Sequence, residues 1–428
     1  MASNTDIQLR SQVIYSIYVR AHTEEGTFNA IHADLDRIKA LGVDIIWFMP
    51  IHPIGIKGKK GSLGCPYANR DYRTVNPEYG TMADFRRLVD AIHEKGMKCI
   101  IDVVYNHTSP DSTLVREHPE FFYRKPDGSM GNHVGDWTDV VDLDYRVPEL
   151  WDYQIESLKL WASIVDGFRC DVASMVDVAF WCKARAAVEE VRPGCIWLAE
   201  TVEGSFAQEN RRVGLYTGTD CEMYRAFDME YDYDIWCVFH RYLTGQGHLS
   251  NYADALNFQE CQYPGNFIKM RCLENHDQPR ICSYIKEETE LENITAMLYF
   301  LKGSTLLYAG QEFCCDHTPS LFEKEVFPRS GRDLSSLLAK LNRMKKELLS
   351  PEDAAQYDAD DDSHILICRR TDGKTDKLGV FSLKGKPATV AVPFPDGNYT
   401  NHLDGQPVTV SGGQLCCHGD PVILSRNA

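Results

Sequence analysis

The chain has 428 residues, 43% of them hydrophobic and 25% charged, and its formal net charge is −17. This length exceeds that of one simple domain, and the composition is typical of a globular protein rather than a disordered one. The negative charge disfavours nucleic acid and anionic membrane surfaces as partners and is compatible with a neutral substrate.

The cysteines indicate a reducing environment. There are fifteen of them, an odd number, and many lie within apolar runs, as expected of buried thiols. The first twelve residues are mostly polar and lack the apolar core of a signal peptide, and no run is long enough to span a membrane. We therefore expect a cytoplasmic protein with no membrane partner. The oligomeric state is not predicted.

Strand-like apolar runs alternate with amphipathic helical patterns through the first 350 residues, which is typical of repeated βα units. The first run, residues 13–19, precedes a helix with an apolar stripe over residues 31–41. The next strand is predicted at residues 44–49. The helix after it begins with Thr81 and Asp84, which form a capping-box pattern.

Six more strands are predicted at residues 99–105, 165–170, 195–199, 226–231, 267–273 and 304–308. Eight strands separated by helices favour a closed (β/α)8 TIM barrel. An open doubly wound sheet is disfavoured, because its glycine-rich dinucleotide fingerprint is missing. We assign residues 1–107 and 146–350 to this α/β barrel.

Two other parts interrupt or follow the barrel. Residues 108–145, rich in Pro, Gly, Asp and Trp, are too long for an idle loop and predict a short inserted lid subdomain after the third strand. Residues 351–428 combine short β-patterned runs with turn pairs such as Asp372-Gly373, which predicts a C-terminal antiparallel β-sandwich domain. The acidic run 358–362 is interpreted as a solvated linker.

Acidic and imidazole side chains stand at the predicted carboxyl ends of four strands. They are Asp102 with His107, Asp171, Glu200, and His276 with Asp277. Taken singly, each is more often a helix cap or a structural hydrogen-bonding group. Because the carboxyl ends of barrel strands meet at one mouth, four such segments in chain order favour a shared site. Carboxylates gathered in this way are what acid-catalysed displacement at a sugar carbon requires.

The residue types suggest separate roles for two of these carboxylates. Arg169 and Asp171 share one face of their strand, and an adjacent arginine keeps a carboxylate ionised, as a nucleophile must be. Glu200, partly desolvated near another carboxylate, should have a raised pKa and act first as acid and then as base. Double displacement with retention requires the two carboxyl groups to lie roughly 5–5.5 Å apart.

These motifs resemble those of the α-amylase superfamily of retaining α-glucoside hydrolases. The resemblance runs from Tyr15-Ser-Ile-Tyr-Val-Arg20 to Tyr308-Ala-Gly-Gln-Glu312 and on into the β-rich tail. It implies the same roles for Asp171 and Glu200 and makes Asp277 the carboxylate that grips the sugar ring. It further implies substrate binding by Tyr67, His107, Arg169 and His276, supported by Asp102 and Asn106.

The chain departs from the family pattern after the nucleophile. Ser174 and Met175 stand where typical endo-acting α-amylases carry a Lys-His pair that contacts the leaving-side glucan and supplies a carbonyl to calcium. Different leaving-side contacts are therefore expected. No cofactor is expected to be required and no metal ligand is assigned. Calcium is left open, because Asn106 is present but no second cluster of oxygen ligands stands near it in the sequence.

The resulting prediction is a retaining glycoside hydrolase that cleaves α-glucosidic bonds, α-1,4 by preference, in maltodextrin or starch-type oligosaccharides. One alternative is an α-1,6-glucosidase or a transglycosylase of the same superfamily, since Val172 follows the nucleophile as in many α-1,6-acting members. Another is a non-catalytic carbohydrate-binding or partner-binding homologue, which the intact set of three carboxylates disfavours. Endo or exo action is not predicted.

Overall fold

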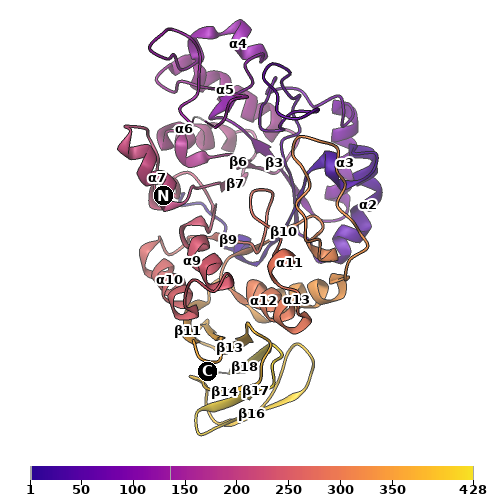
Figure 1. The fold of residues 1–428 in the computed structure, drawn as a ribbon, viewed down its shortest axis with the longest axis vertical. Coiled ribbons are helices and arrows are strands. Elements are labelled where there is room, and N and C mark those ends of the chain that lie inside the picture. The colour runs from indigo at the N-terminus through magenta and orange to yellow at the C-terminus, as the bar shows by residue number, and fades with distance from the viewer. Residues whose placement is uncertain (1, 135, 428) are drawn as a thin grey trace.

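The computed structural model describes residues 2–134 and 136–427 and confirms the predicted fold class (Figure 1). Eight parallel strands close into a barrel in the order β1-β10-β9-β8-β7-β6-β3-β2. Each predicted strand segment contributes one of them. Their bounds are β1 Val13–Ile17, β2 Ile45–Phe48, β3 Lys98–Val103, β6 Gly167–Cys170, β7 Ile196–Ala199, β8 Met229–Tyr231, β9 Lys269–Arg271 and β10 Ser304–Tyr308.

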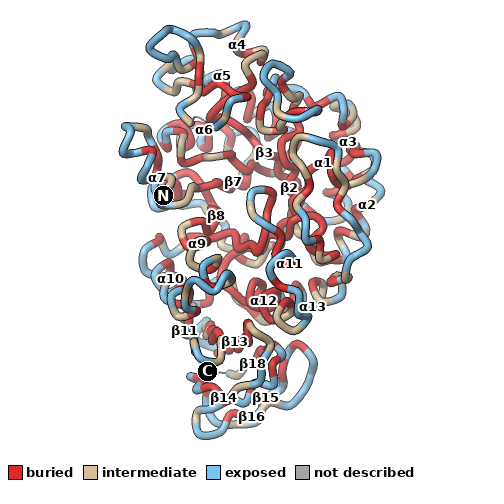
Figure 2. The backbone as a smooth tube through the Cα atoms, in the orientation of Figure 1, coloured by how far each residue is buried: buried red, intermediate tan, exposed pale blue. Residues whose placement is uncertain are grey.

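The barrel strands are short and almost entirely buried (Figure 2). In a (β/α)8 barrel, helices cover the strands outside and side chains fill the interior. The register places Asp102 of β3 level with Arg169 of β6, and Arg169 level with Leu198 of β7. Strands β3 and β6 therefore present charged side chains at matching heights.

The connecting helices cover the outside of the barrel (Figure 1). The predicted capping box of Thr81 and Asp84 is confirmed, with both reciprocal hydrogen bonds formed. The helices before the C-terminal domain, outside the inserted segment, are α1 Val19–His22, α2 Phe28–Ala40, α3 Met82–Glu94, α5 Pro148–Ala162, α6 Val178–Glu189, α7 Gly204–Arg212, α8 Asp220–Met223, α9 Tyr233–Leu243, α10 Leu249–Gln262, α11 Ile281–Tyr284, α12 Glu288–Phe300 and α13 Ser335–Leu348; 3-10 turns are η1 Ile7–Ser11, η3 Ala173–Met175 and η4 Gln311–Phe313.

The segment between β3 and α5 forms a small unit of its own. Its strands β4 His107–Thr108 and β5 Val141–Asp142 pair antiparallel, and between them lie α4 Thr113–Glu117 and η2 Pro119–Phe121. Because β4 follows β3 after only a few residues, the base of this unit is held at the barrel mouth. We keep residues 108–145 as the proposed bounds of the inserted subdomain.

The C-terminal part forms two four-stranded antiparallel sheets, with orders β11-β12-β13-β18 and β14-β17-β16-β15. Apolar residues of both sheets, such as Val380 and Val410, share one core. The predicted linker at 358–362 is wrong in part, because Asp358 and Asp360 belong to β11. The bounds are β11 Ala354–Asp360, β12 Ile365–Thr371, β13 Thr375–Ser382, β14 Ala388–Ala391, β15 Gly397–Thr400, β16 Pro407–Ser411, β17 Gln414–Cys417 and β18 Val422–Asn427.

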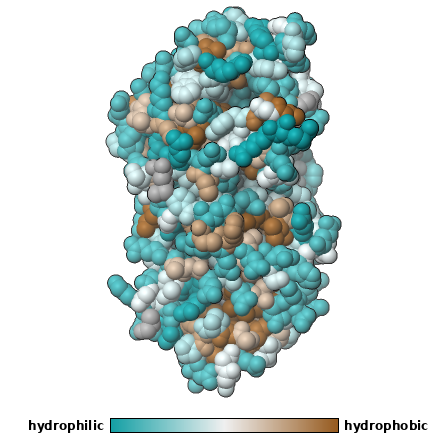
Figure 3. Space-filling model, turned by 90° about the vertical axis from the view of Figure 1, so that its left-hand side faces the viewer, coloured by the Kyte–Doolittle hydropathy of each residue, from teal (hydrophilic) through white to brown (hydrophobic). Residues whose placement is uncertain are grey.

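The surface of the molecule is mainly polar. The face shown in Figure 3 is largely hydrophilic, and its hydrophobic residues lie in separate groups. All fifteen cysteines are among the described residues, and each is a free thiol. Within residues 2–134 and 136–427, no helix has the length and apolar character needed to cross a bilayer.

Candidate functional site

A pocket of about 300 Å3 opens at the barrel mouth, where the carboxyl ends of β3, β6 and β7 meet the inserted subdomain. It brings together most of the residues that the sequence pattern selects. Those that line it are Tyr67, His107, Asp171, Glu200, His276 and Asp277. Arg169 and Asp102 lie beneath them and are fully buried, whereas Asn106 borders a neighbouring pocket instead.

A single guanidinium connects three of the acidic groups. Arg169 Nη1 donates to Asp171 Oδ1 at 2.8 Å and to Asp102 Oδ1 at 3.0 Å. Its Nη2 lies 2.8 Å from Glu200 Oε1, an ion pair by distance rather than a directed hydrogen bond. The strand register explains the geometry, because Arg169 lies level with Asp102 on one neighbouring strand and with Leu198 of β7 on the other. Asp171 and Glu200 each follow two residues later, after Arg169 and Leu198 respectively. Asp171 and Glu200 are thereby held close together.

The charge balance of this cluster affects Glu200 most. Burial raises the pKa of Glu200 well above its ordinary value, the Arg169 charge opposes the shift, and the nearby Asp171 and Asp277 charges add to it. Burial also raises the pKa of Asp102. One guanidinium contacts three carboxyl groups directly, so ionising all three would leave uncompensated negative charge in a desolvated site. The cluster therefore favours a retained proton on Glu200.

The residue after Asp171 fixes the other oxygen of Glu200. The backbone N–H of Val172 donates to Glu200 Oε2 at 2.7 Å. Val172 has φ 37° and ψ 42°, in the left-handed region that β-branched residues rarely occupy. Strained backbone of this kind persists only where the surrounding structure imposes it, and it is frequent at functional sites.

Tyr67, His276 and Asp277 form another part of the pocket wall. The Tyr67 hydroxyl donates to Asp102 Oδ2 at 3.1 Å and lies 2.7 Å from His276 Nε2. The two rings stack with centroids 5.2 Å apart and planes inclined by 9°. Burial lowers the pKa of His276, so the neutral imidazole is favoured. Asp277 is exposed and lies 3.1 Å from His276 Nε2, where its carboxylate faces the pocket opening.

Near Asn106, one oxygen of the buried Asp142 is engaged by His133, and the other has no hydrogen-bond partner. The Asn106 amide nitrogen lies 3.1 Å from His107 Nδ1, and Asp142 Oδ2 accepts the backbone N–H of His133 at 2.7 Å and lies 2.6 Å from its Nδ1. Calcium needs six to eight oxygen ligands. Across residues 2–134 and 136–427, no group of three or more His, Cys, Asp or Glu side chains is arranged to hold a metal.

Sequence reasoning missed the side chains that form the upper walls of the pocket. They are Lys60, Cys65, Trp137, Asp139, Val140, Leu321 and Phe322. All come from loops, where no periodicity marks a residue as facing a site. The only available signal was the tryptophan-containing composition of the inserted segment, which pointed to a lid without identifying Trp137.

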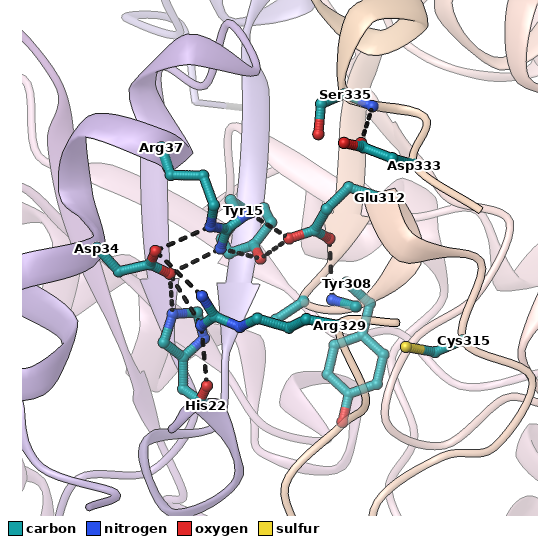
Figure 4. Close-up of polar contacts among 12 residues, drawn as sticks. Tyr15, His22, Asp34, Arg37, Tyr308, Glu312, Cys315, Arg329, Asp333 and Ser335 are labelled. Carbon is teal, nitrogen blue, oxygen red and sulfur yellow. Dashed lines mark hydrogen bonds and ion pairs between the residues drawn. The ribbon is translucent and has the colours of Figure 1, made fainter. Parts of the chain in front are cut away.

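A buried polar network anchors the loop that carries Leu321 and Phe322 (Figure 4). Glu312, in η4 at the start of this loop, accepts from Tyr15 Oη at 2.6 Å and from Arg37 Nη1 at 2.7 Å. Arg37 also donates to Asp34 at 2.8 and 2.7 Å. Arg329, near the loop's end, donates to Asp34 Oδ2 at 3.1 Å. The network therefore ties both ends of the loop to β1 and α2.

Two family profiles match the chain over nearly all its length. The profile described as alpha amylase, catalytic domain, matches residues 3–127 and 133–358, and the one described as bacterial alpha amylase C-terminal domain matches residues 356–424. A curated relative, alpha-amylase MalA of Haloarcula japonica, is 30% identical over 314 residues, which are 70% of this chain and 44% of that protein. The chain spans about half the length of the curated relatives it matches.

Solved structures of similar length match the whole fold. An alpha-amylase from Lactobacillus plantarum is 43% identical with a TM-score of 0.95, and the match covers 98% of this chain and 100% of that one. A noncanonic maltogenic alpha-amylase, AmyB from Thermotoga neapolitana, is 32% identical with a TM-score of 0.87, with the same coverage of 98% and 100%. The similarity therefore extends over the barrel and both smaller parts.

Proposed function

Because this chain belongs to the alpha-amylase family, we propose that it is a retaining glycoside hydrolase that cleaves α-1,4-glucosidic bonds in maltodextrin-type oligosaccharides. The observation that carries the proposal is the Arg169 guanidinium, which contacts both Asp171 and Glu200 in a pocket large enough for a sugar. A shared cation favours the short carboxyl separation of retaining enzymes, roughly 5–5.5 Å.

In the proposed first step, a carboxylate oxygen of Asp171 attacks the anomeric carbon while Glu200 gives its proton to the glycosidic oxygen that leaves. This forms a covalent glycosyl ester on Asp171 and releases the leaving-side sugar. In the second step, ionised Glu200 takes a proton from water, whose oxygen attacks the same carbon and breaks the ester. Two inversions give net retention, and Glu200 regains its proton.

The other site residues are proposed to bind and shape the sugar. Asp277 and His276 hold ring hydroxyls more tightly as the ring flattens toward an oxocarbenium ion, and Tyr67 supplies an aromatic surface beneath it. Arg169 keeps Asp171 in its attacking position. No cofactor takes part in these steps. A cytoplasmic location is part of the proposal and is supported by the fifteen free thiols.

Glycosyl transfer to a sugar acceptor is a second candidate activity, favoured by the apolar side chain of Val172, which lines the pocket beside Glu200. Such a surface can hold an acceptor sugar in place of water against the same covalent intermediate. Cleavage of α-1,6 bonds remains the alternative linkage. The test is to incubate the protein with maltotetraose and with isomaltose and to separate the products by chromatography. Hydrolysis of maltotetraose is expected, and products longer than maltotetraose would indicate transfer. Cleavage of isomaltose alone would overturn the proposed preference for α-1,4 bonds.

A further inference from the structure

One loop joins two walls of the pocket. We call residues 56–64, which follow β2, the bridge segment. On one side it meets the inserted subdomain, where Lys60 Nζ lies 3.2 Å from Asp139 Oδ1 and donates to the Asp136 carbonyl at 3.1 Å. Both Lys60 and Asp139 line the pocket. The bridge segment therefore contributes a charged part of the pocket wall together with the subdomain.

On its other side the bridge segment meets the loop after β10. The backbone N–H of Leu63 donates to the Phe322 carbonyl at 3.0 Å, and that of Ser62 donates to Glu323 Oε1 at 2.7 Å. Gly61 has φ +63°, and a Cβ placed on it would lie 2.6 Å from Cβ of Phe322, so only glycine permits this close approach. The loop after β10 is itself held by the Glu312 and Asp34 network of Figure 4.

The barrel order shows which end of the site is closed. Around the mouth, β2 lies between β1, the neighbour of β10, and β3, so the bridge segment spans the β10, β1, β2 and β3 side. Glu200 follows β7, which is separated from β2 by β3 and β6 on one side and by four strands on the other. Since the leaving sugar must reach Glu200, the side beneath the bridge segment receives the glycone.

We propose that the bridge segment closes the glycone end of the pocket, so that the enzyme acts on the non-reducing ends of short α-glucans rather than within long chains. This inference rests on the proposed function and adds the class of substrate. The pocket volume, about 300 Å3, lies at the lower end of small-molecule sites. Lys60 offers a donor and Asp139 an acceptor to the hydroxyls of the terminal glucosyl unit, and Phe322 faces its apolar ring surface.

The test compares maltoheptaose with maltoheptaose whose non-reducing end carries a 4,6-O-ethylidene group, with products followed by chromatography. An enzyme that binds chain ends should cleave the blocked substrate at least about 100-fold more slowly, because the added group meets the closed wall. Comparable rates on the two substrates would overturn the inference while leaving the proposed function intact. If the protein cleaved none of the four substrates, namely the two heptaosides, maltotetraose and isomaltose, the proposed function would be overturned and this inference with it.

A variant with residues 57–62 replaced by two glycines tests whether the bridge segment is the barrier. We expect it to cleave the blocked substrate at least about tenfold faster than the unaltered protein. A folded variant that remains inactive on the blocked substrate, but active on maltoheptaose, would overturn the assignment. The comparison in the unaltered protein does not depend on the folding of the variant. The matched control removes the side chains of Lys183 and Asp152, an exposed ion pair whose atoms lie 2.8 Å apart on the helical surface. It should leave the ratio of the cleavage rates on blocked and unblocked maltoheptaose unchanged.

Discussion

The backbone N–H of Val172 donates to Oε2 of Glu200 at 2.7 Å, and it does so from a left-handed backbone conformation with φ 37°. Such a conformation costs of order 1–3 kcal/mol for a non-glycine residue. The chain therefore maintains local strain directly after Asp171 while fixing the orientation of the carboxyl group proposed as acid and base. This relationship links the turn after β6 to the protonation state of the residue that follows β7.

Replacing the Val172 amide by an ester, with α-hydroxyvaline at this position, should shift the alkaline limb of the pH–activity profile upward by about one unit. Activity requires protonated Glu200 and is lost as the pH rises through its pKa, which burial already raises. The N–H stabilises the ionised form, so its removal raises that pKa further. An unchanged alkaline limb would contradict this role of Val172.

Two controls accompany the ester. The same backbone change at Ile196, whose N–H donates to the Asp166 carbonyl at 2.9 Å, should leave the alkaline limb in place. Val172→Gly should have a higher melting temperature than Val172→Ala, because only glycine adopts positive φ without strain. The opposite order would show that Val172 is not strained.

Asp171→Asn should abolish turnover of maltotetraose, and Glu200→Gln should lower kcat by about 10²–10⁴-fold. The first removes the attacking carboxylate, and the second removes the proton that assists departure. Initial rates and circular dichroism spectra separate loss of chemistry from loss of fold. Asp90→Asn, on the exposed face of α3, is the matched control and should retain full activity. Unchanged turnover in Asp171→Asn would exclude it as nucleophile.

Asp34→Asn should lower the free energy of unfolding by about 2 kcal/mol at neutral pH. Burial opposes ionisation of Asp34, but hydrogen bonds from His22 and Arg37 outweigh it and hold its pKa below the ordinary value. The stabilisation is therefore present above the unfolded-state pKa, about 3.9, and is lost as the pH falls through the lower folded-state pKa. Urea titrations should show the two proteins converging below about pH 4.

A destabilisation by Asp34→Asn that did not shrink in acid would argue against a charge-based role for the network. Glu209→Gln provides the comparison, since Glu209 pairs with Arg212 on the surface of α7 and both side chains are exposed. Its effect on the free energy of unfolding should be much smaller than that of Asp34→Asn at every pH, because solvent screens an exposed pair.

Chelation with EDTA should leave the melting temperature and the activity unchanged, because His133 already engages Asp142 Oδ2 and the described residues hold no cluster of three His, Cys, Asp or Glu side chains that could bind a metal. His133→Ala should lower the free energy of unfolding by about 1–3 kcal/mol, since Asp142 is almost fully buried and would lose its contact with the imidazole while keeping the one with the backbone N–H. Calorimetry with and without EDTA checks both. A large fall in melting temperature on chelation would show that a bound metal stabilises the protein.

The barrel strands and the polar cluster were predictable because both follow from local pattern. Apolar runs mark the strands, and their carboxyl ends converge at one mouth in any (β/α)8 barrel, so Asp171 and Glu200 had to lie near each other. The C-terminal sheets followed from turn pairs. The contact of one guanidinium with three carboxyl groups depends on the register of β3, β6 and β7, which no single strand sequence specifies.

Loop geometry accounts for what the sequence did not predict. Lys60 and Phe322 are 262 positions apart in the sequence. Their loops are joined by a backbone hydrogen bond from Leu63 to Phe322, and a backbone hydrogen bond leaves no signature in the residue types. The left-handed turn at Val172 runs against the preferences of valine, so local propensity argues against it. The acidic run at 358–362 was misinterpreted because strand pairing with β12 overrides the low β-propensity of aspartate.

The most direct test of the proposed mechanism is to treat Glu200→Gln with 5-fluoro-α-glucosyl fluoride and to locate the label by mass spectrometry of proteolytic peptides. The fluorine at the ring slows both steps, and the good leaving group restores the first, so the glycosyl ester should accumulate. We predict one 5-fluoroglucosyl unit covalently bound to Asp171. A label on another residue, or a product formed with inversion and without any labelled peptide, would contradict double displacement at Asp171.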